Sequence, residues 1–247
     1  MILEPICKFC GAARDVRGIH DLSCTAGGDI VLRHNAIRDA VYRFAQRAKT
    51  NPELEKAGLL AEPGVLLELR RPADVLIEGV MRVGPAAASV SPIERTALDI
   101  KVINALGVDH RAKTVEDPIS PMDAYHEKAL KLEDTAARCA AQGITYVPMV
   151  FTIQGGVGRH AEAILHQLAN RIAPLEQKTA SNIFGEITAD ISRRLATHAA
   201  RSILRRSGKR VTEMHHTQYG SPWRALLEAA DVDEDESEGS GQAAGCC

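Results

Sequence analysis

The sequence has few aromatic residues and no long hydrophobic run. Aromatic side chains make up 4% of the 247 residues, which disfavours base stacking as the main way of holding single-stranded nucleic acid. No run of about 18 or more apolar residues occurs, so no segment is expected to cross a membrane as a helix. The first residues lack the basic-then-apolar pattern of a secretory signal. We therefore expect an intracellular protein, nuclear or in another reducing compartment, rather than a secreted one.

Cysteine and net charge are also low. Six cysteines, unevenly placed, are too few for a disulfide framework. The formal charge of −2 neither requires nor excludes a nucleic-acid partner, because the charged residues are unevenly distributed. With 45% hydrophobic and 25% charged residues, the composition is typical of a globular protein with one main domain.

Composition divides the chain into four segments. Residues 1–30 are rich in Cys, His and Gly, and residues 31–175 alternate helical and strand-like patterns. Residues 176–225 look helical and become basic, and residues 226–247 are acidic and rich in Gly and Ser. We predict a metal-binding knuckle, an α/β core, a basic helical extension and a tail with too little apolar surface to fold.

The central segment predicts the order helix, three strands, helix, strand, helix. Apolar residues at helical spacing predict the helices at 33–49, 122–141 and 160–172. Short β-branched or Leu-rich runs bounded by Gly, Pro or charge predict the strands at 65–69, 74–77, 98–103 and 144–153. This order is typical of an α/β sandwich, a mixed sheet covered by helices.

Four metal-ligand residue types follow one another near the N-terminus. Cys7, Cys10, His20 and Cys24 have the spacing C-x2-C-x9-H-x3-C. Two thiolates three residues apart can hold one side of a tetrahedral Zn²⁺, and the His and the third Cys can close the other. The segment has almost no core of its own, so the metal would supply its folding free energy. Unrelated buried thiols beside a surface His are the alternative.

An acidic constellation lies on two of the predicted strands. Asp99 and Lys101 point to the same side of a strand, because side chains alternate. A carboxylate that holds Mg²⁺ beside a Lys that orients water suits phosphodiester hydrolysis. Asp74 offers a second carboxylate, and Glu62 or Asp39 a third. The alternative is a simple surface ion pair, which contributes little to stability.

These motifs, in this order, resemble a known family. The Cys7–Cys24 knuckle precedes Arg33-His34-Asn35, then Arg71-Pro-Ala-Asp74 and Asp99-Ile-Lys101. This arrangement is similar to the restriction-like endonuclease region of non-long-terminal-repeat retrotransposon polyproteins. There, a Cys-Cys-His-Cys knuckle and an Arg-His-Asn helix precede a PD-(D/E)xK nuclease, C-terminal to a reverse transcriptase. The resemblance covers residues 5–210. The chain departs from that pattern at Ala73, which stands between Pro72 and Asp74.

The resemblance implies a restriction-endonuclease-like core and a Mg²⁺-dependent DNA nicking activity. It assigns Asp74 and Asp99 as Mg²⁺ ligands and Lys101 as the catalytic lysine. It places His34 and Asn35 beside the active site or the DNA backbone. It further implies DNA as ligand, RNA as a second ligand of the zinc knuckle, and a reverse transcriptase module as partner, since no polymerase motif is present. A catalytically inactive, zinc-dependent nucleic-acid-binding remnant is the other interpretation.

A basic stretch follows the core. Within eighteen residues that contain no acid, the sequence has Arg193, Arg194, Arg201, Arg205, Arg206, Lys209 and Arg210. Such a stripe would attract phosphates without sequence preference. An ordinary solvated helix face is the alternative.

Overall fold

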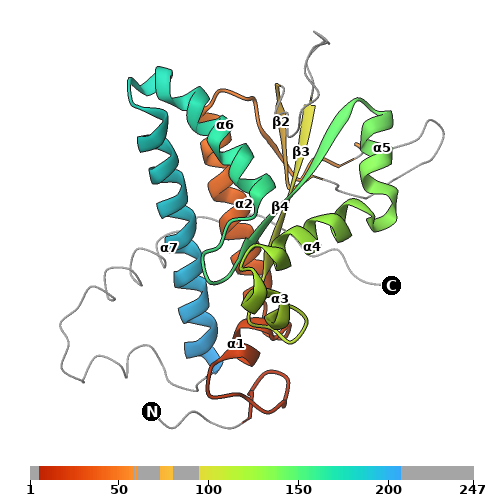
Figure 1. The fold of residues 1–247 in the computed structure, drawn as a ribbon, viewed down its shortest axis with the longest axis vertical. Coiled ribbons are helices and arrows are strands. Elements are labelled where there is room, and N and C mark those ends of the chain that lie inside the picture. Colours follow the sequence, from red (N-terminus) through yellow and green to blue (C-terminus); the bar gives the residue numbers. More distant parts are fainter. Residues whose placement is uncertain (1–5, 58, 61–72, 80–94, 207–247) are drawn as a thin grey trace, which may run out of the picture.

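The computed structural model describes residues 6–57, 59–60, 73–79 and 95–206 (Figure 1). The helices are α1 (Ile19–Ser23), α2 (Asp29–Arg47), α3 (Arg111–Glu116), α4 (Ser120–Leu130), α5 (Thr135–Ala141), α6 (Arg159–Glu176) and α7 (Ala180–Arg206). The strands are β1 (Glu53–Leu54), β2 (Val75–Glu78), β3 (Arg95–Ile103) and β4 (Ile144–Thr152). Across these described ranges, no helix is long and apolar enough to cross a membrane.

The described strands form one mixed sheet in the order β1-β2-β3-β4. β2 pairs antiparallel with β3, so that Val75 lies opposite Leu98, whereas β4 pairs parallel with β3. The parallel pair requires a crossover, which α3, α4 and α5 supply. The prediction of a mixed α/β sheet covered by helices is confirmed.

The two faces of the sheet are covered by different helices (Figure 1). Leu98 and Ile100 belong to a large core shared with α2, α6 and α7, whereas Ala97 belongs to a smaller core with Cys139 of α5. Ile103 packs on that second side with Met122 of α4. Because side chains alternate along β3, Asp99 and Lys101 lie on the α4–α5 side of the sheet.

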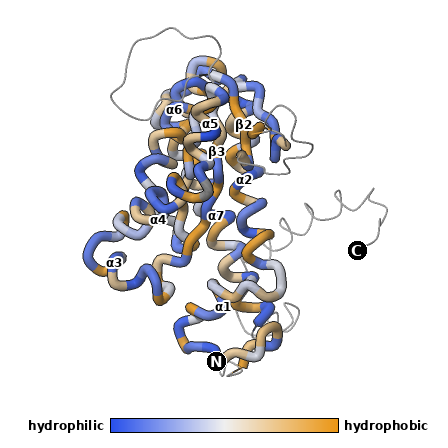
Figure 2. Tube along the Cα trace, turned by 90° about the vertical axis from the view of Figure 1, so that its right-hand side faces the viewer, coloured by the Kyte–Doolittle hydropathy of each residue, from blue (hydrophilic) through white to orange (hydrophobic). Residues whose placement is uncertain are grey.

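The helix α7 is packed against the core along much of its length. Its apolar side chains recur every four residues and are fully buried: Ile183, Ile187, Ile191 and Leu195. Hydrophobic and hydrophilic residues accordingly alternate along α2 and α7 in Figure 2. The described part of the predicted extension therefore belongs to the same hydrophobic core as the sheet.

Some boundaries differ from the predictions. The single helix predicted over 122–141 is wrong: α4 ends at Leu130, a 3₁₀ turn follows, and α5 begins at Thr135. Asp134, with φ of 54°, adopts the left-handed conformation that a continuous helix does not allow. Leu132, in the 3₁₀ turn, is 56% exposed. The strand predicted at 65–69, Glu62, Arg71, Pro72 and the tail 226–247 lie outside the described residues.

Candidate metal cluster and acidic site

The predicted knuckle residues come together. One ligand atom each from Cys7, Cys10, His20 and Cys24 lies within 4.8 Å of all the others. The Sγ–Sγ distances are 4.0 Å from Cys7 to Cys24 and 3.6 Å from Cys10 to Cys24. Cys10 Sγ lies 3.4 Å from His20 Nε2. Zn–S bonds of about 2.3 Å at tetrahedral angles separate two thiolates by about 3.8 Å. These four residues could therefore hold a structural Zn²⁺.

Local hydrogen bonds position His20. The Asp15 carboxylate accepts the backbone N–H groups of Arg17, Ile19 and His20 at the start of α1, at 2.7–3.1 Å. A carboxylate at this place satisfies otherwise unpaired N–H groups of the helix. It thereby fixes the first turn of α1, from which the imidazole projects.

The thiol of Cys7 is predisposed to ionise. Burial opposes ionisation, but hydrogen bonds from the backbone N–H groups of Phe9 and Cys10 and from His20 outweigh it and lower the pKa to about 6. Thiolate is the form that binds zinc.

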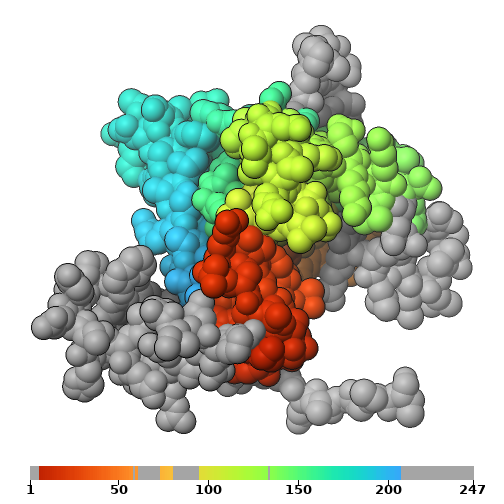
Figure 3. All heavy atoms as spheres, turned by 60° about the horizontal axis from the view of Figure 1, so that its bottom comes forward, coloured from red at the N-terminus to blue at the C-terminus, as the bar shows by residue number. Residues whose placement is uncertain are grey.

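The C-terminal end of α7 holds the cluster segment in place. Arg206 is fully buried and donates hydrogen bonds to the backbone oxygens of Cys24 at 3.3 Å and Ala26 at 2.7 Å. It also pairs with Asp29 at the start of α2. The guanidinium thus ties the cluster segment, α2 and α7 together. In Figure 3 the red N-terminal segment lies between blue α7 and the yellow-green α3–α4 region.

The acidic site lies on β3, as predicted, and gains a contact from β4. Lys101 Nζ lies 2.8 Å from Asp99 Oδ1. The hydroxyl of Tyr146 donates a hydrogen bond to the other carboxylate oxygen of Asp99. Asp99 is 9% exposed. Its carboxylate therefore has little contact with water, and Lys101 and Tyr146 are its two side-chain partners.

Asp74 is held beside this pair. The Asp74 backbone N–H donates to Leu98 O at 3.0 Å, which sets the residue next to β3. Its carboxylate accepts the backbone N–H of Ile100 at 2.6 Å and lies 3.1 Å from His34 Nε2 of α2. The Nδ1 atom of His34 lies 3.3 Å from Asn35 Oδ1. The predicted catalytic residues therefore form two hydrogen-bonded sets, Asp74 with His34 and Asn35, and Asp99 with Lys101. The two sets meet at β3, where the Ile100 N–H that bonds to Asp74 lies between Asp99 and Lys101 in sequence.

The two carboxylates respond differently to this environment. Burial, reinforced by the negative charge of Asp74, raises the pKa of Asp99 despite the neighbouring Lys101. Burial also opposes ionisation of Asp74, but His34 and the Ile100 N–H outweigh it and lower the pKa of Asp74. The hydrogen bond to Asp74 raises the pKa of His34. Two neighbouring carboxylates with opposed pKa shifts thus occupy different electrostatic environments, one dominated by burial and the other by its hydrogen-bond donors.

The remaining acidic and basic expectations have mixed outcomes. Asp39 pairs with Arg38, and within the described ranges only the cysteine–histidine cluster brings three or more metal-ligand side chains together. On the predicted basic stripe, Arg193 and Arg194 pair with Asp190. Arg206 is buried, so its placement on a phosphate-binding face was wrong. Lys209 and Arg210 lie outside the described residues.

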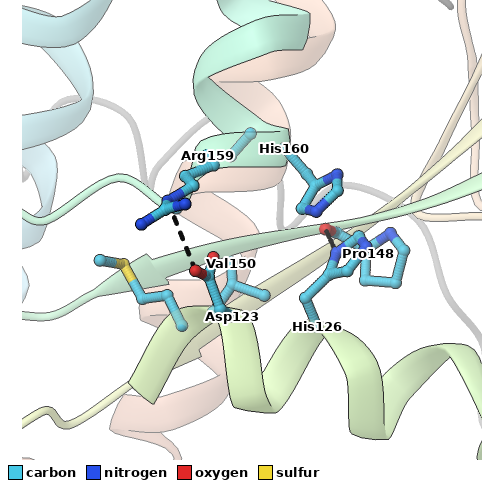
Figure 4. A pocket seen from close by; sticks show the side chains of 9 residues that line it. Asp123, His126, Pro148, Val150, Arg159 and His160 are labelled. Atoms are coloured by element: carbon cyan, nitrogen blue, oxygen red, sulfur yellow. Dashed lines mark hydrogen bonds and ion pairs between the residues drawn. The ribbon is translucent and has the colours of Figure 1, made fainter. Parts of the chain in front are cut away.

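Sequence reasoning did not find a stacked pair of histidines between α4 and α6 (Figure 4). The rings of His126 and His160 are parallel, with centroids 3.6 Å apart. His126 Nδ1 lies 2.9 Å from Pro148 O, so it carries the proton and donates it. Because a metal ion binds in the plane of an imidazole ring, two parallel rings at this spacing cannot share one. The pair is a packing contact beside the Asp123–Arg159 ion pair.

Tyr146 was also missed. It stands opposite Ala97 of β3 in the parallel pairing, and in this register its hydroxyl reaches Asp99. A tyrosine inside a strand gives no sign of such a role in the sequence.

Comparison with protein-family models, with curated proteins and with solved structures finds no match for this chain.

Proposed function

We propose that this protein is a Mg²⁺-dependent DNA endonuclease that nicks DNA, with Asp74, Asp99 and Lys101 at its active site. The observation that supports the proposal is that these three side chains lie near enough to one another, where β2 meets β3, for the charge of each to influence the pKa of another. Asp99 and Lys101 are ion-paired on one face of β3, and Asp74 is bonded to the backbone of the same strand. The resemblance to restriction-like endonucleases of retrotransposons assigns the same three residues.

The donor set suits Mg²⁺. This cation prefers oxygen ligands, keeps several waters and is commonly bound through one or two carboxylates. Asp74 and Asp99 supply two carboxylates. Burial, with a smaller contribution from the charge of Asp74, raises the pKa of Asp99, and a bound cation would favour the ionised form of both groups. Mg²⁺ would polarise the phosphate and lower the pKa of a bound water.

The protein side chains have distinct roles in this proposal. Asp74 and Asp99 hold the cation, and His34 fixes the orientation of the Asp74 carboxylate by its hydrogen bond. Asp99 and Asp74 raise the pKa of Lys101, against the effect of burial. The amine therefore stays protonated and can orient the attacking water or interact with the phosphate. Asn35 supports His34 from the adjacent position on α2.

The cysteine–histidine cluster contributes position rather than chemistry. All four ligand positions are protein side chains, which is the pattern of a structural zinc site. In this proposal its Zn²⁺ orders the segment in front of α2, the helix that carries His34 and Asn35. DNA is the proposed ligand of the protein. RNA is a second proposed ligand, bound through the knuckle, and a reverse transcriptase module is a proposed protein partner.

A plasmid-nicking assay tests the proposal. Zinc-loaded full-length protein is incubated with supercoiled plasmid and Mg²⁺, and the nicked form is quantified with time. We expect Asp99→Asn and Lys101→Ala each to lower the rate at least about 100-fold, which corresponds to about 3 kcal/mol of lost transition-state stabilisation. Asp134→Asn is the matched control, because Asp134 is exposed and Asn tolerates its left-handed backbone.

Two outcomes would contradict the proposal. Wild-type protein that binds DNA but never nicks it would support the catalytically inactive nucleic-acid-binding interpretation instead. Nicking that persists in Asp99→Asn and Lys101→Ala would assign the activity to a different site or to a contaminant.

A further inference from the structure

A cleft of about 660 Å³ opens beside the acidic site. One wall consists of α1 and the first turn of α2, with Ile19, Leu22 and Ile30. The other wall consists of the end of β3, the loop that follows it and the middle of α4, with Val102, His110 and Tyr125. Figure 3 views the molecule from the side on which the N-terminal segment adjoins the α3–α4 region. The volume lies within the range of about 300–1,000 Å³ typical of sites for small ligands.

The cleft adjoins the catalytic lysine. Val102 and Ile103, which line it, directly follow Lys101 on β3. Tyr125 packs against Ile103 on the face of the sheet where Lys101 projects. A chain that passes through the proposed active site would therefore reach this cleft within a short distance along its backbone.

The two walls are braced against each other. The Asn104 side chain, in the loop after β3, donates to Ser23 at 2.8 Å and to Ile19 O at 3.3 Å, both in α1. Its oxygen accepts a hydrogen bond from Gln154 Nε2 at 2.7 Å. This network joins α1 to the loop after β3 and so fixes the two walls relative to each other. A preformed site loses less conformational entropy on binding.

The lining suits an uncharged aromatic group better than a phosphate. Its apolar walls include an aromatic pair, His110 and Tyr125, in an edge-to-face arrangement with centroids 6.4 Å apart. Its acids, Asp15 and Asp109, offset the charge of Arg33, so the cleft has no cationic excess. Nucleobases have apolar faces and polar edges, and they stack on aromatic side chains.

An exposed apolar side chain stands at the mouth of the cleft. Val108, in the loop after β3, lines the cleft and is 91% exposed. Apolar side chains in such positions are used by DNA-bending proteins to separate stacked bases.

From these features we propose that the cleft binds one or two unpaired nucleotides of the DNA next to the cleaved position. The inference rests on the proposed endonuclease function, whose substrate it specifies: DNA that is locally unpaired. The low aromatic content of the chain agrees with a short site of this kind rather than a long single-strand channel.

A binding experiment tests the cleft independently of cleavage. Zinc-loaded full-length protein, without added Mg²⁺, is titrated into two labelled duplexes of equal length. One duplex is fully paired and the other has a central bubble of unpaired thymidines, and fluorescence anisotropy gives each Kd. We expect the wild type to bind the bubble about tenfold more tightly, the size of one base–aromatic stacking contact.

Two variants on neighbouring residues give a matched comparison. Ile30 is partly exposed and lines the cleft, whereas Val31 is 59% exposed and does not. Ile30→Glu and Val31→Glu add the same charge to the first turn of α2, where Glu is favourable. We expect Ile30→Glu to abolish the tenfold preference and Val31→Glu to retain it. If Ile30→Glu does not fold, Val108→Glu at the exposed mouth is expected to lose the preference in its place.

The outcomes separate this inference from the proposed function. A wild type that binds both duplexes equally, or an equal loss of preference in the Ile30 and Val31 variants, overturns the cleft as a nucleotide site. Nicking without bubble preference overturns the cleft inference alone, and bubble preference without nicking overturns the endonuclease alone. Absence of any DNA binding overturns both.

Discussion

Removal of zinc is expected to unfold the N-terminal segment and to loosen the end of α7. In residues 6–28 the buried hydrophobic side chains are Cys7 and Cys24 themselves, so the segment has almost no apolar core to stabilise it. Structural zinc sites supply about 10–16 kcal/mol of apparent binding free energy at neutral pH. That quantity far exceeds what the segment gains from hydrophobic burial.

The effect should reach α7 through Arg206. Two of its hydrogen-bond acceptors, the backbone oxygens of Cys24 and Ala26, belong to the cluster segment. Each hydrogen bond from a charged donor contributes about 1.5–3 kcal/mol, so loss of both acceptors should open the last turn of α7. The half of α7 that carries Ile183 and Ile187 packs on the main core and should stay protected.

Hydrogen–deuterium exchange with and without a zinc chelator measures this effect. We expect exchange to rise in residues 6–28 and in the last turn of α7, but not around Ile183. Metal analysis should find one zinc per chain in the wild type and in Cys139→Ala, and none in Cys10→Ser. Zinc-free protein with unchanged protection in residues 6–28 would refute the reasoning.

Two further predictions concern stability. Burial and nearby arginines lower the pKa of His198 to about 4, whereas an unfolded His titrates near about 6.5. The unfolded chain then binds the extra proton, so the unfolding free energy should decrease as pH falls from about 6.5 to 4, by at most about 1.4 kcal/mol per pH unit. Urea denaturation of His198→Gln should show a flatter dependence; an identical slope contradicts this assignment. Tyr146→Phe leaves a buried oxygen of Asp99 with one partner fewer, so it should lower the unfolding free energy by about 1–2 kcal/mol. Tyr42→Phe removes no hydrogen bond to Asp99, so it should lower the unfolding free energy less. Equal losses in the two variants would contradict a stabilising role of the Tyr146 hydroxyl.

Local patterns predicted most of the elements well. The helical spacing of Ile37 and Val41 and the alternation around Asp99 each specify an element by themselves, because burial of one face follows directly from sequence period. The helix predicted over 122–141 failed because apolar spacing continued across Asp134. The left-handed backbone at that residue is set by how α4 and α5 each pack on β4, which the local pattern does not contain.

The candidate sites divide in the same way. The knuckle was predictable because its four ligands come from eighteen consecutive residues, and the chain needs only tight turns to bring them together. The role of Tyr146 was not predictable, because its distance from Asp99 depends on the register of two parallel strands joined by a long crossover. The stacked pair of His126 and His160 and the buried Arg206 depend likewise on helices distant in sequence.

The sequence alone determined the candidate metal-ligand set and the shared face of Asp99 and Lys101, since each follows from spacing within one short segment. It also determined the mixed α/β class, which follows from the order of predicted helices and strands. Only the tertiary structure decided the partners of these residues. In the tertiary structure His34 contacts Asp74, Tyr146 donates a hydrogen bond to Asp99, and the end of α7 packs against the cluster segment. The cleft between α1 and α4 also forms only there. Contacts of this kind depend on how separate elements pack, and packing depends on the volume and shape of many side chains at once.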